Sequence, residues 1–179
     1  MTTTTTLGEL TGDYVLDTAR TRIGFTARAA LVSTVRGHFE AFDGGARLDG
    51  GTPSASSVRI TIRAASVQTR HRKRDDHLRG GDFLDVGAHP VLTFVSTRVE
   101  QVDATGFKVT GDLTVRGATR PVTVDFTLAG AGSDATGTFR AHFLGRTALD
   151  RADWGVSGGG AMIGRKVTLE FDVTAVRQG

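Results

Sequence analysis

The chain has 179 residues, contains no cysteine and carries a formal net charge of +3. Its length suits one domain with its own core, and the lack of cysteine excludes disulfides and thiolate metal sites. The small net charge, and a basic segment without aromatic residues, speak against a nucleic-acid partner. No stretch reaches the ~20 apolar residues of a membrane-spanning helix. Residues 1–7 lack the basic and apolar parts of a secretory signal, so we expect a cytoplasmic protein.

Short segments that alternate apolar and polar residues follow a polar, repetitive start. Residues 1–12 predict a flexible leader, and we expect a single domain over 13–177. The alternation has the two-residue period of β-strands and predicts about eight of them, at residues 23–29, 35–48, 58–63, 90–102, 107–116, 122–128, 137–149 and 167–174. Turn-forming residues predict turns at 43–45, 103–106, 116–117, 130–137 and 157–160.

One stretch, residues 71–94, departs from this alternation and looks helical. Because the strands do not alternate with long helices, a parallel α/β sheet is disfavoured. A sheet with one apolar face must pack on a second sheet or close on itself, and the long predicted strands favour closure into a tall barrel. We therefore predict an all-β fold, an extended eight-stranded antiparallel barrel with one short helix at a mouth.

The apolar strand faces form the predicted lining of this barrel. A bound alkyl chain would gain about 0.8 kcal/mol for each CH₂ group buried there. The same side chains could instead fill the interior by packing on one another, and the pattern leaves both alternatives open. The candidate lining residues are Phe25, Phe39, Ile60, Ile62, Phe94, Leu113, Val115, Phe126, Phe139, Phe143, Leu169 and Phe171.

Charged residues gather in the predicted helix and suggest two other functions. The basic run Arg70–Arg74 is typical of a solvated helix face, but it could also contact an anionic membrane or an acidic partner. Beside it, Asp75, Asp76, His77 and His89 suggest a small enzyme at the barrel mouth, with acid–base or metal chemistry.

The spacing of these groups favours a structural role. Among these four residues and the nearby His71, only His71 and Asp75 have the i, i+4 spacing that brings side chains together on one face of a helix. Two residues are fewer than the three protein ligands of a metal site. Asp75 also precedes Arg79 by four residues, a spacing that predicts an ion pair on the helix surface. We therefore expect no metal, no cofactor and no enzymatic activity.

The order of the motifs resembles the YceI-like family of bacterial polyisoprenoid-binding proteins. The resemblance runs from about Gly12 to Val176 and is most specific around the predicted helix. It is carried by Tyr14–Asp17, Ile23–Arg28, Val35–Phe39, Phe42–Gly44, Arg74–Leu78, Asp82–Asp85, His89–Ser96, Val109–Val122 and Arg151–Gly155.

This resemblance implies a lipocalin-like barrel that binds, stores or transports an isoprenoid or other long-chain lipid in its lumen, without catalysis. If the helix forms, we expect Arg74, His77 and Arg79 to bind the ligand near the barrel mouth. Trp154, the single tryptophan, would close one end of the barrel or contact the ligand. A lipid carrier must visit a membrane to load, so transient membrane contact is expected; a homodimer stays an open alternative.

Overall fold

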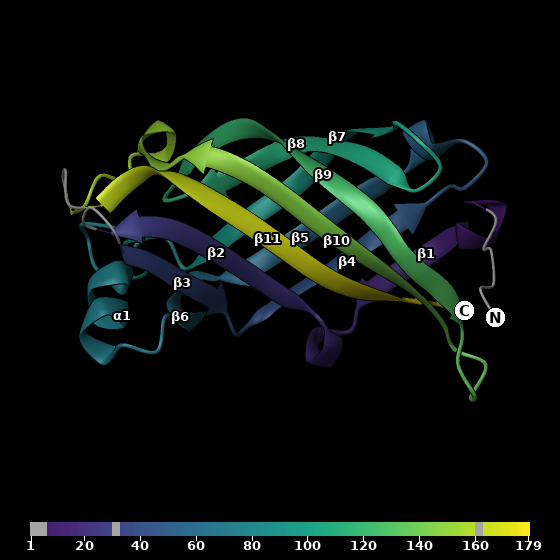
Figure 1. Ribbon diagram of the computed structural model, residues 1–179, viewed down its shortest axis with the longest axis horizontal. Helices are drawn as coiled ribbons and strands as arrows, with labels where there is room; N and C mark the ends of the chain where they lie inside the picture. Colours follow the sequence, from purple (N-terminus) through teal and green to yellow (C-terminus); the bar gives the residue numbers. More distant parts are fainter. Residues whose placement is uncertain (1–6, 30–32, 160–162) are drawn as a thin grey trace.

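The computed structural model describes residues 7–29, 33–159 and 163–179. It is a long antiparallel β-barrel with one α-helix, α1 (Arg72–Arg79), at one end and the C-terminus at the other (Figure 1). The predicted all-β barrel is confirmed. The strands are β1 (Gly12–Leu16), β2 (Arg22–Ala29), β3 (Ser33–Phe39), β4 (Phe42–Leu48), β5 (Ser57–Arg63), β6 (Val67–Gln68), β7 (Val91–Gln101), β8 (Gly106–Val115), β9 (Ala118–Ser133), β10 (Phe139–Asp150) and β11 (Ile163–Arg177).

Eight strands close the barrel, in the order β1-β4-β5-β7-β8-β9-β10-β11, and β1 pairs with β11 to complete the ring. The remaining three strands extend this ring toward α1. There, β2 pairs with β11, β3 pairs with β2, and β6 pairs with β3. The segments β1 and β2, β3 and β4, and β5 and β6 follow one another along the chain, and each pair counts as one broken strand. With β7 to β11 this gives eight long strands, and the predicted number of eight is confirmed.

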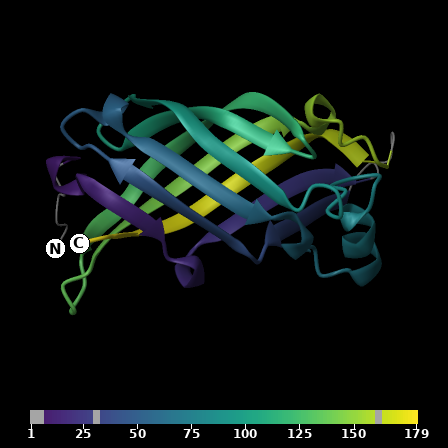
Figure 2. The same cartoon turned by 180° about the vertical axis from the view of Figure 1, so that it is seen from behind.

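Short 3₁₀ turns explain two of the breaks. The turn η2 (Thr18–Arg20) separates β1 from β2, and the carboxylate of Asp17 caps it by accepting a hydrogen bond from the backbone N–H of Ala19. The turn η4 (Ala64–Ser66) separates β5 from β6. Figure 2 shows the barrel turned by 180°, so that the wall at the back of Figure 1 faces the viewer.

Several predicted boundaries differ from the structure, among them two turns and the end of the helical stretch. The turn expected at 43–45 is wrong, because these residues lie inside β4, where Gly44 pairs with Ile60. A side chain at Gly44 would place its Cβ 2.8 Å from the carbonyl oxygen of Arg59, so glycine serves a close approach there. The turn expected at 130–137 begins later, since β9 continues to Ser133. The helix ends at Arg79 and does not extend to residue 94.

The expected leader falls partly within the fold. Residues 1–6 lie outside the described residues, whereas Leu7–Leu10 form the 3₁₀ turn η1. Leu10 is buried, and its carbonyl oxygen accepts a hydrogen bond of 2.8 Å from the hydroxyl of Tyr14. This turn packs over the end of the barrel where the C-terminus lies.

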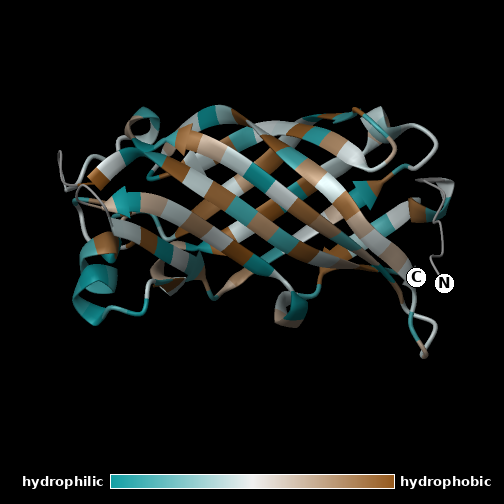
Figure 3. Cartoon of the chain, viewed as in Figure 1, coloured by the Kyte–Doolittle hydropathy of each residue, from teal (hydrophilic) through white to brown (hydrophobic). Residues whose placement is uncertain are grey.

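The core is the interior of the barrel, because alternate residues of each strand point inward. On β9, Val122, Val124 and Phe126 are buried while the residues between them are exposed. The same alternation of apolar and polar residues is visible along the strands in Figure 3. Across the residues that the structure describes, no helix has the length and apolar character needed to cross a membrane.

Candidate functional site

The barrel encloses two apolar cavities, which we call the large chamber and the small chamber. The large chamber has a volume of about 200 Å³ and lies against α1. The small chamber has a volume of about 100 Å³ and lies toward η1, near the C-terminus. Ile60 contributes to the lining of both. The interior is thus neither fully open nor fully filled.

Most of the predicted lining residues meet in these chambers. Phe126 and Phe143 line the small chamber. Phe139 lines neither chamber and packs instead with Leu10 and Tyr14 near the C-terminus. The large chamber is lined by the predicted residues Phe25, Phe39, Ile60, Ile62, Phe94, Leu113, Val115, Leu169 and Phe171, and by Arg74, His77 and Trp154.

The helix α1 closes one side of the large chamber and is tied to the barrel through Thr69, which follows β6. The guanidinium of Arg74 donates to the hydroxyl and the carbonyl oxygen of Thr69, at 2.8 and 2.9 Å. The carboxylate of Asp75, which is 3% exposed, accepts from the backbone N–H and the hydroxyl of the same threonine. His71 caps the helix by accepting from the backbone N–H of Arg74. These bonds hold Arg74 and His77 against the chamber.

The prediction of an ion pair between Asp75 and Arg79 is wrong. Asp75 turns inward because the chain before α1 brings two hydrogen-bond donors of Thr69 within reach of its carboxylate. Arg79 pairs instead with Asp76 at 3.2 Å and donates to the carbonyl oxygens of Ala65 and Val67. It therefore anchors the helix and does not line either chamber.

Three of the four groups considered for catalysis, His77, Asp75 and Asp76, have separate partners. His77 lies 3.2 Å from a carboxylate oxygen of Asp82, and its ring meets Phe83 edge to face. Asp75 is bonded to Thr69, and Asp76 to Arg79. Among residues 7–29, 33–159 and 163–179, no group of three His, Asp or Glu side chains has the arrangement of a metal site.

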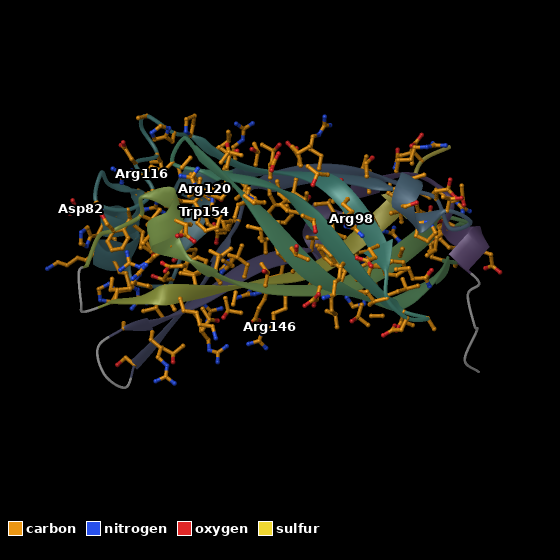
Figure 4. The ribbon with its side chains drawn as sticks, turned by 90° about the horizontal axis from the view of Figure 1, so that it is seen from above. Asp82, Arg98, Arg116, Arg120, Arg146 and Trp154 are labelled. Atoms are coloured by element: carbon orange, nitrogen blue, oxygen red, sulfur yellow. The ribbon has the colours of Figure 1, made fainter. Side chains whose placement is uncertain are left out.

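Trp154 and Arg151 close the α1 end of the barrel from the 3₁₀ turn η5 (Arg151–Trp154), which follows β10. The indole N–H of Trp154 donates to the carbonyl oxygen of Leu113 at 2.9 Å, so the ring is fixed across the large chamber. Figure 4 shows Trp154 at the same end as Asp82 and Arg116, away from Arg98.

Arg151 is a functional candidate that the sequence pattern did not indicate. Its guanidinium donates to the carbonyl oxygens of Val156, Ile163 and Gly164, at 2.7 to 3.0 Å, and lines the large chamber. Burial lowers the pKa of this guanidinium, and the nearby carboxylate of Asp150 opposes that shift. No periodicity distinguishes an arginine that is buried in a turn from one that is exposed.

Other lining residues were visible in the pattern but not singled out. Ile23, Val122 and Val124 lie on inward strand faces and line the large chamber. Phe83 and Val156 also line it, but they lie in connections, where no alternation marks the inward face.

Comparison with known proteins finds relatives over nearly the whole chain. A family model described as the YceI-like domain matches residues 14–175. A UPF0312 protein of Pseudomonas paraeruginosa is 38% identical over 171 residues, which cover 94% of this chain and 89% of the relative. A UPF0312 protein of Vibrio parahaemolyticus is 38% identical over 152 residues, which cover 84% of this chain and 80% of the relative.

Solved structures share the barrel. Burkholderia cenocepacia BcnA has a TM-score of 0.80 at 25% identity, over 89% of this chain and 98% of its own. A YceI protein of Campylobacter jejuni has a TM-score of 0.76 at 26% identity, over 85% and 90%. A polyisoprenoid-binding domain from Saccharophagus degradans has a TM-score of 0.66 at 16% identity, over 92% and 98%. At that identity the last likeness speaks for the fold alone.

Proposed function

This chain belongs to the YceI-like family, and from that premise we propose that its barrel binds an isoprenoid or other long-chain lipid in the lumen, for storage or transport and without catalysis. The observation that carries the proposal is the pair of apolar chambers, of about 200 and 100 Å³, inside a closed barrel. Such concave, apolar cavities with few polar groups are typical of small-molecule sites. A barrel of the same fold is described as polyisoprenoid-binding, which agrees with this choice of ligand.

The energetics of such a ligand follow from its tail. Each buried CH₂ group contributes about 0.8 kcal/mol, so about ten of them supply roughly 8 kcal/mol before the costs of association. A ligand of this kind needs no strong polar contact to bind.

The polar end of the ligand is expected at the α1 end of the large chamber. Four polar side chains gather there, Arg74 and His77 from α1, and Arg151 and Trp154 from η5. The tail then points along the barrel axis toward the small chamber, whose lining is almost wholly apolar.

The large chamber offers a direct test, because the single tryptophan, Trp154, lines it. Titration of delipidated protein with a prenyl alcohol should change the fluorescence of Trp154 in a saturable way. The variant Ala27→Phe adds a ring to the chamber lining and should weaken binding, whereas Ala148→Phe, on the exposed outer face of β10, should not. Delipidated wild-type protein that binds neither prenyl nor acyl chains would contradict the proposal.

The same end of the barrel is the proposed site of transient membrane contact. Arg70, Arg72 and Lys73 are exposed at α1 and form no ion pair among the described residues. Exposed basic residues contribute about 1 kcal/mol each near an anionic lipid surface. They would hold the mouth against a membrane while a lipid enters.

Vesicle cosedimentation tests this contact. Binding should be stronger to phosphatidylcholine vesicles that contain phosphatidylglycerol than to phosphatidylcholine alone, and it should weaken with salt. The double variant Arg72→Glu/Lys73→Glu should lose this binding. The control Arg98→Glu/Lys108→Glu makes the same charge change at exposed positions farther from α1 and should retain it. Arg98 is labelled in Figure 4, and Lys108 lies on β8 between Phe107 and Val109, which line the small chamber. Equal binding by both double variants would refute the contact.

A further inference from the structure

A row of inward-facing residues crosses four neighbouring strands between the two chambers. The register pairs Phe107 on β8 with Phe126 on β9, and Phe126 with Gly145 on β10. It then pairs Gly145 with Phe171 on β11. We call Phe107, Phe126, Gly145 and Phe171 the aromatic row. A glycine thus stands where three neighbouring positions carry phenylalanine.

The missing side chain at Gly145 lets two rings of the aromatic row meet. Strands β9 and β11 are separated by β10, so their backbones lie about 9.5 Å apart. The ring centroids of Phe126 and Phe171 are nevertheless only 5.8 Å apart. A Cβ at position 145 would lie 2.4 Å from a ring carbon of Phe126, so the ring occupies the space that a side chain would take.

The two rings lie at the boundary between the chambers. Phe126 lines the small chamber and Phe171 lines the large one. Ile60, which lines both, is on β5, the strand across from β10 in the eight-membered ring. Phe107 and Phe143, whose centroids are 6.4 Å apart, line the small chamber beside Phe126. The lumen therefore narrows at the aromatic row.

We propose that Phe126, seated over Gly145, determines the length of the chain that the barrel accepts. A ligand tail that enters from α1 fills the large chamber and ends at the ring of Phe126. A longer tail must displace this ring to reach the small chamber. This inference rests on the proposed lipid-binding function and adds the residue that selects among lipids by length.

A series of straight-chain alcohols of increasing length tests the inference, with Trp154 fluorescence as the readout. For wild-type protein, each added CH₂ group should tighten binding about fourfold until the large chamber is full, and affinity should then level off. In Phe126→Ala the two chambers join, so the levelling should occur at a longer chain. Phe126→Leu, which retains an apolar side chain, should shift it in the same direction and serves if the alanine variant does not fold.

Phe139→Ala is the matched control. Phe126 and Phe139 are each 8% exposed, but Phe139 lines neither chamber. The control should level off at the wild-type length. If wild-type protein binds the series and neither substitution of Phe126 moves the levelling point, the inference is overturned while lipid binding stands. An equal shift in the control would also overturn it, since general loosening would then explain both. If wild-type protein binds no chain of any length, the proposed function itself fails.

Discussion

Replacement of Arg151 by methionine should destabilise the protein, because this arginine holds the connection between β10 and β11 onto the end of the barrel. The side chain is 7% exposed and donates to the carbonyl oxygens of Val156, Ile163 and Gly164. Its guanidinium carbon also lies 5.9 Å from the ring centroid of Phe83. Among the described residues, Arg151 forms no ion pair with a carboxylate.

The expected loss follows from these bonds. Hydrogen bonds to a charged group contribute about 1.5–3 kcal/mol each, so the three bonds amount to roughly 5–9 kcal/mol. The buried cation costs several kcal/mol in lost hydration, and methionine does not carry this cost. We therefore expect Arg151→Met to lower the free energy of unfolding by about 2–4 kcal/mol.

Equilibrium unfolding in urea, followed by Trp154 fluorescence, measures this change. Arg151→Lys keeps the charge but cannot reach three acceptors in the same planar geometry, so it should also be less stable than the wild type. An Arg151→Met protein as stable as the wild type would refute the reasoning, since the three bonds would then only offset the cost of burying the charge.

Three further substitutions test the remaining anchors. Asp75→Ala leaves two buried donors of Thr69 without an acceptor and should lower the free energy of unfolding by about 2–4 kcal/mol in urea denaturation. Tyr14→Phe removes one hydrogen bond to the carbonyl oxygen of Leu10, so calorimetry should show a Tm about 2–4 °C lower, and an unchanged Tm would count against this bond. Hydrogen bonds within the β9–β10 hairpin, chiefly from Thr136, hold the pKa of Asp134 well below its ordinary value. A lowered pKa in the folded state stabilises the protein above the unfolded pKa of about 3.9, and this stability is lost as pH falls toward the folded pKa. The Tm difference between wild type and Asp134→Asn should therefore be largest near neutral pH and shrink below pH ~4; a constant difference would contradict it.

Local patterns determined much of the fold. The alternation of side chains along a strand depends only on backbone geometry, so inward and outward faces can be predicted from sequence, as on β9 with Val122 and Val124 inside. The charged segment that contains α1 stood out for the same reason, because it breaks that alternation. Closure of the sheet into a barrel could be predicted because an open sheet leaves unpaired N–H and C=O groups along its edge strands.

The depth of each inward residue along the barrel could not be predicted in this way. Phe126 and Phe139 share the inward orientation, yet only Phe126 lines a chamber, because strand register decides which neighbours each side chain meets. The inward turn of Asp75 likewise depends on Thr69, which a different segment places beside the helix. Interactions of this kind join residues whose proximity local sequence does not specify.

The sequence by itself determined an all-β chain, its inward faces and the charged helix, since these depend on residues close together along the chain. Only the tertiary structure decided that Arg151 is buried and that the rings of Phe126 and Phe171 meet over Gly145 to divide the lumen. The physical reason is that pairing between distant strands sets which side chains face one another, and the space left between them is the binding site.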